Sequence, residues 1–378
     1  MKKKTFMIMG MGILLLIFFT SCAREKSGWA GTIEEENGVT VIRNPKQPIH
    51  TGSVLSFEEE LVLRPDAESQ ELFFNIIAAV RVDDAGAIYV LDMGDCQIKV
   101  FSKNGDFLRV IGGKGQGPGE MQMPSTMDLA GDERLVVYDM RKSCLSLFSF
   151  NGNFIKEYSV AKYFPLVRVR TDQKGHFAIQ HYVRDEKNTA YKIILLDSKL
   201  ESVREIASVE RKRNPPRVIR LINPLLHYWF TQDGQILTGY STDYELRFLD
   251  LEGNLIKKII TDYTPLPLSN EEKQRLTEER FPDSGGGVPE GLKLEFLDHY
   301  PPFSSFFTDS QGRIFVRTYE EAGEGMHYYD IFDSEGRYLA RVPVYDRVAA
   351  LKKGKLYTLE EDEEGYQVVK RYHLKWTI

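Results

Sequence analysis

One pattern of two short strands around a polar turn recurs six times in this chain of 378 residues, and it limits the fold more than any other feature. The copies are VDDAGAIYVLD (82–92), LAGDERLVVYD (129–139), TDQKGHFAIQH (171–181), TQDGQILTGY (231–240), TDSQGRIFVRT (308–318) and LKKGKLYTLE (351–360). Within each copy, β-branched and aromatic residues alternate with other residues on both sides of the turn, which is typical of strands. After most copies comes a third strand, another turn and a fourth strand, as in QIKVFSKNGDFLRVIG. The repeating unit is therefore four antiparallel strands, named A to D along the chain.

Six such units predict an all-β chain that folds as a six-bladed β-propeller. A single twisted sheet cannot bury both of its faces, so each unit needs neighbours, and the ring must close. The last copy ends in YQVVKRYHLKWTI, which supplies a third strand but no fourth. The segment GSVLSFEEELVLRPD (52–66) precedes the first copy and forms a strand with no partner nearby. We predict that this segment is the fourth strand of the last blade, which places the propeller domain at 52–378.

The stretch AIYVLDMGDCQIKVFSKNGDFLRVIGGKGQGPGEMQMP (87–124) resembles an NHL repeat. The chain from Gly52 onward resembles the six-bladed propeller lipoproteins of bacteria. This resemblance implies that the glycine-rich run at 112–124 links two blades. A phosphate-binding loop of the Walker type would need Gly-Lys-Ser/Thr at the start of a helix, but Lys114 is followed by Gly115.

The N-terminus MKKKTFMIMGMGILLLIFFTSC has the features of an export signal, with a basic start and an apolar run at 6–19. That run of about 14 residues is shorter than the ~20 residues that span a bilayer as a helix. Ser21 and Cys22 resemble a bacterial lipobox, although Phe19 departs from its usual aliphatic residue. We predict a signal peptide at 1–21, lipidation at Cys22, a tether at 22–51 and a membrane-anchored protein of the cell envelope, periplasmic or surface-exposed. An ordinary secretory signal is the alternative.

The composition bears on the possible partners and on what stabilises the fold. The formal net charge of -6 argues against a nucleic-acid partner, because such proteins usually carry a basic surplus. The chain has only three cysteines, so a disulfide framework does not hold the fold. The core of the propeller must supply its stability.

A long insertion at 262–302 lies between the fourth and fifth copies. It contains SNEEKQRLTEERF, in which Ser269 and Glu272 have the spacing of a capping box, so we expect a helix of about three turns. The glycine-rich stretch PDSGGGVPEG follows as a hinge. In a propeller, the D-to-A and B-to-C connections emerge at the same face. The insertion therefore predicts a lid or partner-docking element at that face, whereas the short turns of the opposite face are expected to enclose no molecule.

Two sets of residues are candidates for a ligand site. The residue that ends strand B is polar in every copy, and these residues are Asp92, Asp139, His181, Tyr240, Thr318 and Glu360. For the two aspartates, the alternative is that they cap the following turn. The second set lies in or near strand A and the third B-to-C loop, and comprises Arg81, Arg168, Arg170, Arg184, His227 and Trp229. Arginines and aromatic rings suit an anionic or carbohydrate ligand, and salt bridges to neighbouring blades are the alternative for the arginines.

Three functional interpretations remain open. Cys22, the six-copy repeat and the long loops of one face lead us to expect a binding or scaffolding module without a cofactor, with a protein or carbohydrate partner at the loop-rich face. The sequence has none of the local signatures of hydrolases and metalloproteases, but propellers assemble sites from distant blades, so this counts only weakly against catalysis. The principal alternative is a hydrolase or lyase with a divalent cation in the channel, as in lactonase-like or amidating-lyase-like propellers. Such an enzyme needs three or four ligands that converge on one cation. A third interpretation, a structural protein, predicts a channel filled by large side chains.

Overall fold

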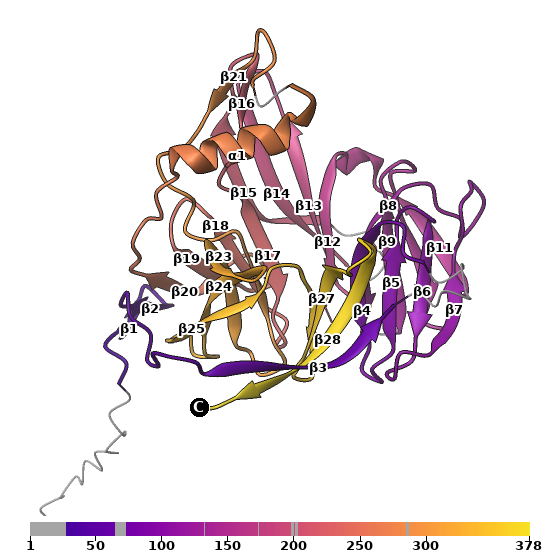
Figure 1. The fold of residues 1–378 in the computed structure, drawn as a ribbon, viewed down its shortest axis with the longest axis horizontal. Coiled ribbons are helices and arrows are strands. Elements are labelled where there is room, and N and C mark those ends of the chain that lie inside the picture. The colour runs from indigo at the N-terminus through magenta and orange to yellow at the C-terminus, as the bar shows by residue number, and fades with distance from the viewer. Residues whose placement is uncertain are drawn as a thin grey trace, which may run out of the picture.

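The computed structural model describes residues 28–378 except 65–72, 132, 173, 198–199, 201–202 and 285–286. Six sheets, each built on four antiparallel strands, are arranged in a ring, which confirms the six-bladed β-propeller (Figure 1). The predicted signal peptide at 1–21 and Cys22 lie outside the described residues. No helix within the described part of the chain is long and apolar enough to cross a membrane.

Each blade is built as the repeat predicts, with consecutive strands paired side by side. Blade 1 contains β4 (Ile77–Val82), β5 (Ile88–Asp92), β6 (Gln97–Phe101) and β7 (Phe107–Ile111). Blade 2 contains β8 (Pro124–Ala130), β9 (Arg134–Asp139), β10 (Cys144–Ser149) and β11 (Phe154–Ser159). Blade 3 contains β12 (Leu166–Thr171), β13 (Phe177–Arg184), β14 (Asn188–Leu196) and β15 (Val203–Lys212).

The remaining blades use the rest of the chain and one strand from its N-terminal side. Blade 4 contains β17 (Leu226–Phe230), β18 (Ile236–Tyr240), β19 (Glu245–Leu249) and β20 (Leu255–Thr261). Blade 5 contains β22 (Ser305–Thr308), β23 (Ile314–Gly323), β24 (Met326–Phe332) and β25 (Tyr338–Tyr345). Blade 6 contains β26 (Val348–Lys352), β27 (Lys355–Glu361), β28 (Gln367–Trp376) and β3 (Leu55–Leu63).

Strand β3 closes the ring as the sequence predicts. It pairs antiparallel with β28, in a register that runs from Leu55 opposite Trp376 to Leu63 opposite Val369. In Figure 1 the indigo β3 lies along the yellow β28, so the two ends of the propeller domain meet in one sheet. The last blade thereby gains its fourth strand and leaves no unpaired edge on β28.

Hydrophobic clusters fill the gaps between blades. Because side chains alternate along a strand, neighbouring residues of β5 pack against different blades. Val90 belongs to the cluster between blades 6 and 1, whereas Leu91 belongs to the cluster between blades 1 and 2. Equivalent clusters fill the other four gaps. Every blade is thus sandwiched by its neighbours, and the core is a ring instead of a single centre.

The prediction that 22–51 is a tether is wrong for part of this range. Residues in this range form the hairpin of β1 (Thr32–Glu36) and β2 (Val39–Asn44), and β2 pairs in parallel with β20. Blade 4 therefore has six strands. The buried Asn44 side chain fixes the hairpin to blade 5, because its Oδ1 accepts the N–H of Tyr338 at 2.7 Å and its Nδ2 donates to the carbonyl of Gly336 at 2.9 Å.

The glycine-rich run links β7 to β8, and its own groups satisfy its backbone. The N–H of Gly117 donates to the Glu120 carboxylate at 2.7 Å, and the N–H of Gly115 donates to the carbonyl of Met121 at 2.9 Å. Gly112 has a φ of +76°, and a Cβ there would lie 2.4 Å from the Met121 side chain. The run is therefore an inter-blade link that requires glycine.

The insertion contains the predicted helix, α1 (Asn270–Arg280), with Ser269 as its N-cap and a complete capping box to Glu272. Further along, β21 (Lys293–Glu295) pairs in parallel with β16 (Val218–Arg220), which lies in the link between blades 3 and 4. Arg220 and Glu295 form an ion pair of 2.8 Å across this contact. The two longest links therefore hold each other above the ring, beside α1 in Figure 1.

Deletion of 52–64 should destabilise the protein far more than its length suggests, because β28 would lose its partner and the ring would stay open. We expect aggregation, or a melting temperature lowered by roughly 10 °C or more. Deletion of 28–38, which removes the outermost strand β1 but not the closing strand, is the control and should have a much smaller effect. Equal melting of the parent and the 52–64 deletion in a calorimeter would contradict the role of β3.

Candidate functional site

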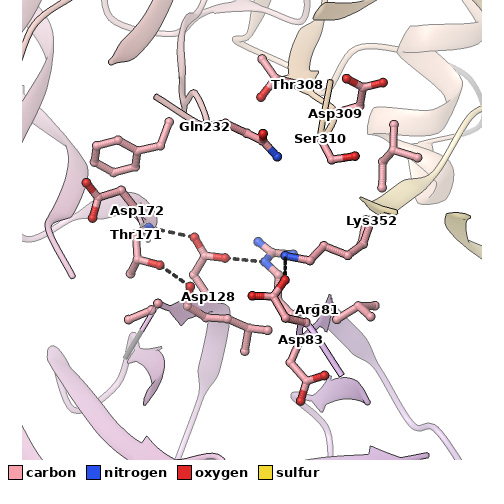
Figure 2. Close-up of a pocket in the computed structure, with 18 of the residues that line it drawn as sticks. Arg81, Asp83, Asp128, Thr171, Asp172, Gln232, Thr308, Asp309, Ser310 and Lys352 are labelled. Atoms are coloured by element: carbon pink, nitrogen blue, oxygen red, sulfur yellow. Dashed lines mark hydrogen bonds and ion pairs between the residues drawn. The ribbon is translucent and has the colours of Figure 1, made fainter. Parts of the chain in front are cut away.

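A funnel of about 410 Å³ opens at the centre of the ring, and residues from all six blades line it (Figure 2). It lies at the face where strand A ends and turns into strand B. The sequence predicted that the short turns of this face would enclose no molecule, but the structure has an open funnel there. Each A-to-B turn is short, but six of them surround one opening, and together they form walls that no single turn could supply.

Three acidic residues at the funnel serve the turns themselves. Asp83, Asp172 and Asp309 each follow strand A, and each accepts a backbone N–H four residues later at 2.8 to 2.9 Å. Side chains of this type cap turns in this way. Figure 2 shows the carboxylates of Asp172 and Asp309 turned away from the opening. These acids therefore shape the walls and leave the funnel interior to other groups.

An ion pair joins the innermost strands of blades 1, 2 and 3. The Nε of Arg81 donates to the Asp128 carboxylate at 2.7 Å, and the other oxygen of Asp128 accepts the N–H of Thr171 at 2.9 Å. Thr171 also donates its hydroxyl to the carbonyl of Leu129 at 2.7 Å. For Arg81, the alternative of a salt bridge to a neighbouring blade is thus the one observed.

Arg168 and Arg170 lie on β12 and differ from Arg81. In the described part of the chain neither one forms a salt bridge, and the Nε of Arg170 is buried without a hydrogen-bond partner. The guanidinium of Arg170 lies 4.3 Å from the centre of the Trp229 ring. Burial, together with the nearby charge of Arg81, lowers the pKa of Arg170 to about 9, and burial also lowers the pKa of Arg168. Of the three guanidinium groups, only that of Arg81 pairs with the Asp128 carboxylate and lines the funnel, which leaves unpaired positive charge on β12 next to Thr171 and Trp229 of the lining.

The rim of the funnel adds further polar groups. Lys352 extends toward Arg81 and forms an ion pair of 2.8 Å with Asp84. The side chains of Gln232 and Ser310 face the opening in Figure 2. The site as a whole offers hydrogen-bond donors from several blades around a small opening, which is the arrangement that binds a polar ligand.

The structure corrects the expectation that Asp92 and Asp139 contact a ligand. Both are 0% exposed. The Asp92 carboxylate accepts N–H groups from Asn75, Ile76 and its own turn, and Lys99 adds an ion pair of 3.2 Å. Burial would raise the pKa of Asp92, but these backbone donors and the Lys99 ammonium hold it below its usual value. Asp139 likewise accepts four backbone N–H groups, so both residues cap their turns.

The other strand-B ends have separate local contacts. His181 packs edge-on against Tyr163 at 5.4 Å, and Tyr240 packs against the cluster between blades 3 and 4. Glu360 accepts the Tyr372 hydroxyl at 2.8 Å and pairs with Lys370 at 3.1 Å, and Thr318 donates its hydroxyl to a backbone carbonyl. Among the described residues, no hydrogen bond or ion pair joins two members of this set.

Four members of the second set lie outside the funnel lining, namely Arg168, Arg170, Arg184 and His227. His227 is 6% exposed, and its ring contacts Phe303 and Phe306 with centroids 6.0 Å apart. Burial, with a smaller contribution from Arg168, lowers the pKa of His227 to about 3, so it is a neutral core residue. Arg184 ends strand β13, instead of lying in the loop as predicted, and is exposed. Trp229 does line the funnel.

Sequence reasoning missed Asp128, Gln232, Ser310 and Lys352. All four lie near the end of strand A; Gln232, Ser310 and Lys352 fall within the copies used to define the repeat, and Asp128 immediately precedes the second copy. The same alignment, compared at the end of strand A as it was at the end of strand B, would have pointed to them. No group of three or more His, Cys, Asp or Glu side chains is placed to hold a metal ion among the residues that the structure describes.

Comparisons with known proteins agree with the ring. Residues 63–221 match the DUF5128 family model, which is described as a 6-bladed beta-propeller. A protein from Bacteroides fragilis NCTC 9343 described as exported has a similar structure, with a TM-score of 0.55, 13% identity, and coverage of 89% of this chain and 100% of that one. A member of the DUF4221 family from Bacteroides vulgatus ATCC 8482 aligns with a TM-score of 0.52 and 10% identity over 86% of this chain and 99% of its own. At these identities the likeness shows the fold alone. No curated protein sequence matches the chain.

Stability should fall as the pH is lowered below about 6.5, because the unfolded chain then binds a proton at His227 that the folded core excludes. With a folded pKa of about 3, each pH unit in this range costs about 1.4 kcal/mol of the free energy of unfolding. The His227→Phe variant should lose this contribution, whereas the control His373→Phe, at a partly exposed site, should keep it. Urea unfolding at pH 7.5 and 5.0 measures the difference, and an identical pH dependence in parent and His227→Phe would contradict the assignment.

Proposed function

We propose that this protein is a lipid-anchored binding module of the cell envelope that holds an anionic ligand in its central funnel. The observation that carries the proposal is an excess of guanidinium groups on the inner strands of blades 1 and 3. Arg81 lines the funnel and pairs with Asp128, whereas Arg168 and Arg170 on β12 lie outside the lining and have no ion pair among the described residues. The ligand is a small molecule, or part of a protein or carbohydrate partner, that bears a carboxylate or phosphate group. The proposal moves the site from the loop-rich face to the face of the A-to-B turns.

The physical argument concerns uncompensated charge. A buried cation without a partner is costly, and an arriving anion would remove that cost while it forms charge-assisted hydrogen bonds. Guanidinium groups suit carboxylate and phosphate because their donors form a planar fork. The Trp229 ring, stacked on Arg170, would hold that fork in one orientation. Asp128 orients Arg81 in the same way.

The funnel also distinguishes this proposal from a structural role. A purely structural ring would fill its centre with large side chains, but here about 410 Å³ stays open. That volume is within the range of small-molecule sites, about 300 to 1,000 Å³. The polar rim of Gln232, Ser310 and Lys352 would supply further hydrogen bonds to a ligand.

The envelope location rests on the N-terminal sequence and on one structural relative. The lipobox-like Ser21 and Cys22 support lipidation, and the Bacteroides fragilis relative is described as exported. The described chain then enters the hairpin β1 and β2 on blade 4, so the anchor would be attached at the outer rim of the ring. The central funnel would remain open to ligands.

Replacement of Arg170 by Met should weaken anion binding. Loss of a charged hydrogen-bond donor costs about 1.5 to 3 kcal/mol, or roughly a 10- to 100-fold rise in Kd. Calorimetric titrations with inorganic phosphate, citrate and glucuronate at low salt measure it, and Arg184→Met, which changes an exposed arginine, is the matched control. If the folded parent binds none of these anions, or if both variants bind as the parent does, the proposal fails.

Replacement of Cys22 by Ala should release the protein from membranes. The variant has no cysteine at position 22 to carry acyl chains. Stable anchoring requires more than one acyl signal, because each buried CH₂ contributes only about 0.8 kcal/mol. Fractionation of cells that express the parent or the variant measures the outcome. The same membrane retention in both would contradict lipid anchoring at this cysteine.

A further inference from the structure

A second cavity, of about 320 Å³, lies between blades 4 and 5 and shares no lining residue with the funnel. We call it the inter-blade pocket. Its walls come from the two additions to the six-bladed plan and from the blades themselves. The segment after β2 contributes Lys46 and Gln47, and the two ends of the insertion contribute 262–267 and 301–302. Blade 4 contributes Tyr244 and Thr261, and blade 5 contributes Thr318, Tyr319, Glu320, Asp330, Tyr338 and Arg341.

We propose that the inter-blade pocket binds a small neutral carbohydrate. The pocket combines hydroxyl, carboxylate and guanidinium groups with tyrosine rings, and its charged groups largely balance. A ligand that offers many hydroxyl groups and no net charge fits such a lining best.

The first part of the argument is a buried carboxyl group. Asp330 is 3% exposed, and its two oxygens accept the hydroxyls of Tyr244 at 2.6 Å and Tyr338 at 2.5 Å. Burial raises the pKa of Asp330, and the hydrogen bonds and Arg341 offset this only in part. The two tyrosines therefore fix Asp330 in one orientation at the pocket wall, and they come from two blades, since Tyr244 directly precedes β19 and Tyr338 lies on β25.

The second part is the balance of charge. Arg341 lies 2.6 Å from Glu320 and 3.9 Å from Asp330. Its guanidinium is thus shared between two acids, whereas Arg168 and Arg170 on β12 have no ion pair among the described residues. An anionic ligand would meet Asp262, Glu320 and Asp330, and a cationic one would meet Arg341 and Lys46. A neutral ligand with vicinal hydroxyls can donate to the carboxylates and accept from the guanidinium at once.

The third part is an unsatisfied hydroxyl. Thr261 lines the pocket and is 5% exposed, and its Oγ1 has no hydrogen-bond partner. A buried hydroxyl without a partner costs free energy, and native structures usually satisfy it with protein, water or ligand. A small shift of the Thr261 side chain, which lies in the wall, would let its hydroxyl meet a ligand.

Aromatic rings complete the wall and connect it to the insertion. Tyr319 stacks on Tyr300 with ring centres 4.8 Å apart, and the Tyr300 hydroxyl donates to Glu272 of α1 at 3.1 Å. Tyr263 packs edge-on against Tyr244 at 5.8 Å. These rings provide apolar faces for the C–H groups of a sugar, and α1 braces the side of the pocket that Tyr319 forms.

The test measures binding of glucose, galactose, mannose and N-acetylglucosamine to the folded chain by saturation-transfer NMR and calorimetry. We expect at least one sugar to bind the parent, and Arg341→Met and Thr261→Val each to raise its Kd about tenfold or more. Thr261→Val keeps the shape of the side chain and removes only the hydroxyl, so its melting curve should match that of the parent. Two controls, Arg170→Met at the funnel and Tyr366→Ala at an exposed site, should leave sugar binding unchanged.

The outcomes separate this site from the funnel. If the parent binds none of the four sugars, or if Thr261→Val binds as well as the parent, the inter-blade pocket is not a carbohydrate site. If Arg170→Met weakens sugar binding as much as Arg341→Met does, the sugar binds in the funnel and the inference is overturned. None of these results bears on the separate proposal that the funnel binds an anion.

Discussion

The pairing of β3 with β28 is the constraint on which the rest of the molecule depends. Each blade buries its two faces only because it has a neighbour on both sides, and that condition holds for the first and last blades only if the ring is closed. The register from Leu55 to Leu63 supplies this closure with backbone hydrogen bonds between segments about 300 residues apart. The funnel follows from it, since the funnel requires the inner strands of all six blades around one axis. The inter-blade pocket follows as well, because blades 4 and 5 can enclose it only while they are held together.

Most of the fold could be predicted because the repeat encodes it locally. The turn chemistry, the alternation within strands and the capping box at Ser269 each depend on residues close in sequence, and the structure agrees with them. The missed hairpin β1 and β2 had a local signal too, since Asn37 and Gly38 form an Asn-Gly turn between alternating segments and both have positive φ. Its docking on β20 had no such signal. Parallel pairing between residues 39–44 and 257–261 depends on the packing of Asn44 against the Gly336 turn of a neighbouring blade.

The candidate site could be predicted only in part, for a physical reason. A polar residue at a strand end is ambiguous, because the same carboxylate can cap a turn or face a ligand. At the ends of strand B, the carboxylates of Asp92 and Asp139 accept backbone N–H groups from two segments, so both residues serve the turns and neither is left for a ligand. Arg81 and Arg170 are both on inner strands, yet Arg81 forms an ion pair with Asp128 whereas Arg170 packs against the ring of Trp229. Which neighbour each arginine meets depends on the blade that follows in the ring, and the sequence around the arginine does not contain that information.

The hairpin on blade 4 gives the molecule a particular mechanical response. If the chain is tethered at its N-terminus, any pull between the membrane and a captured partner is transmitted first to β1, the outermost strand of the six-stranded blade. An antiparallel edge strand pulled from its end opens one hydrogen-bonded pair at a time, which is the weakest way to load a sheet. The hairpin of β1 and β2 would therefore detach from β20 and lengthen the tether before force reached β3. Because the hairpin would unfold first, the pairing of β3 with β28 that closes the ring, and with it the funnel, would be shielded from tension.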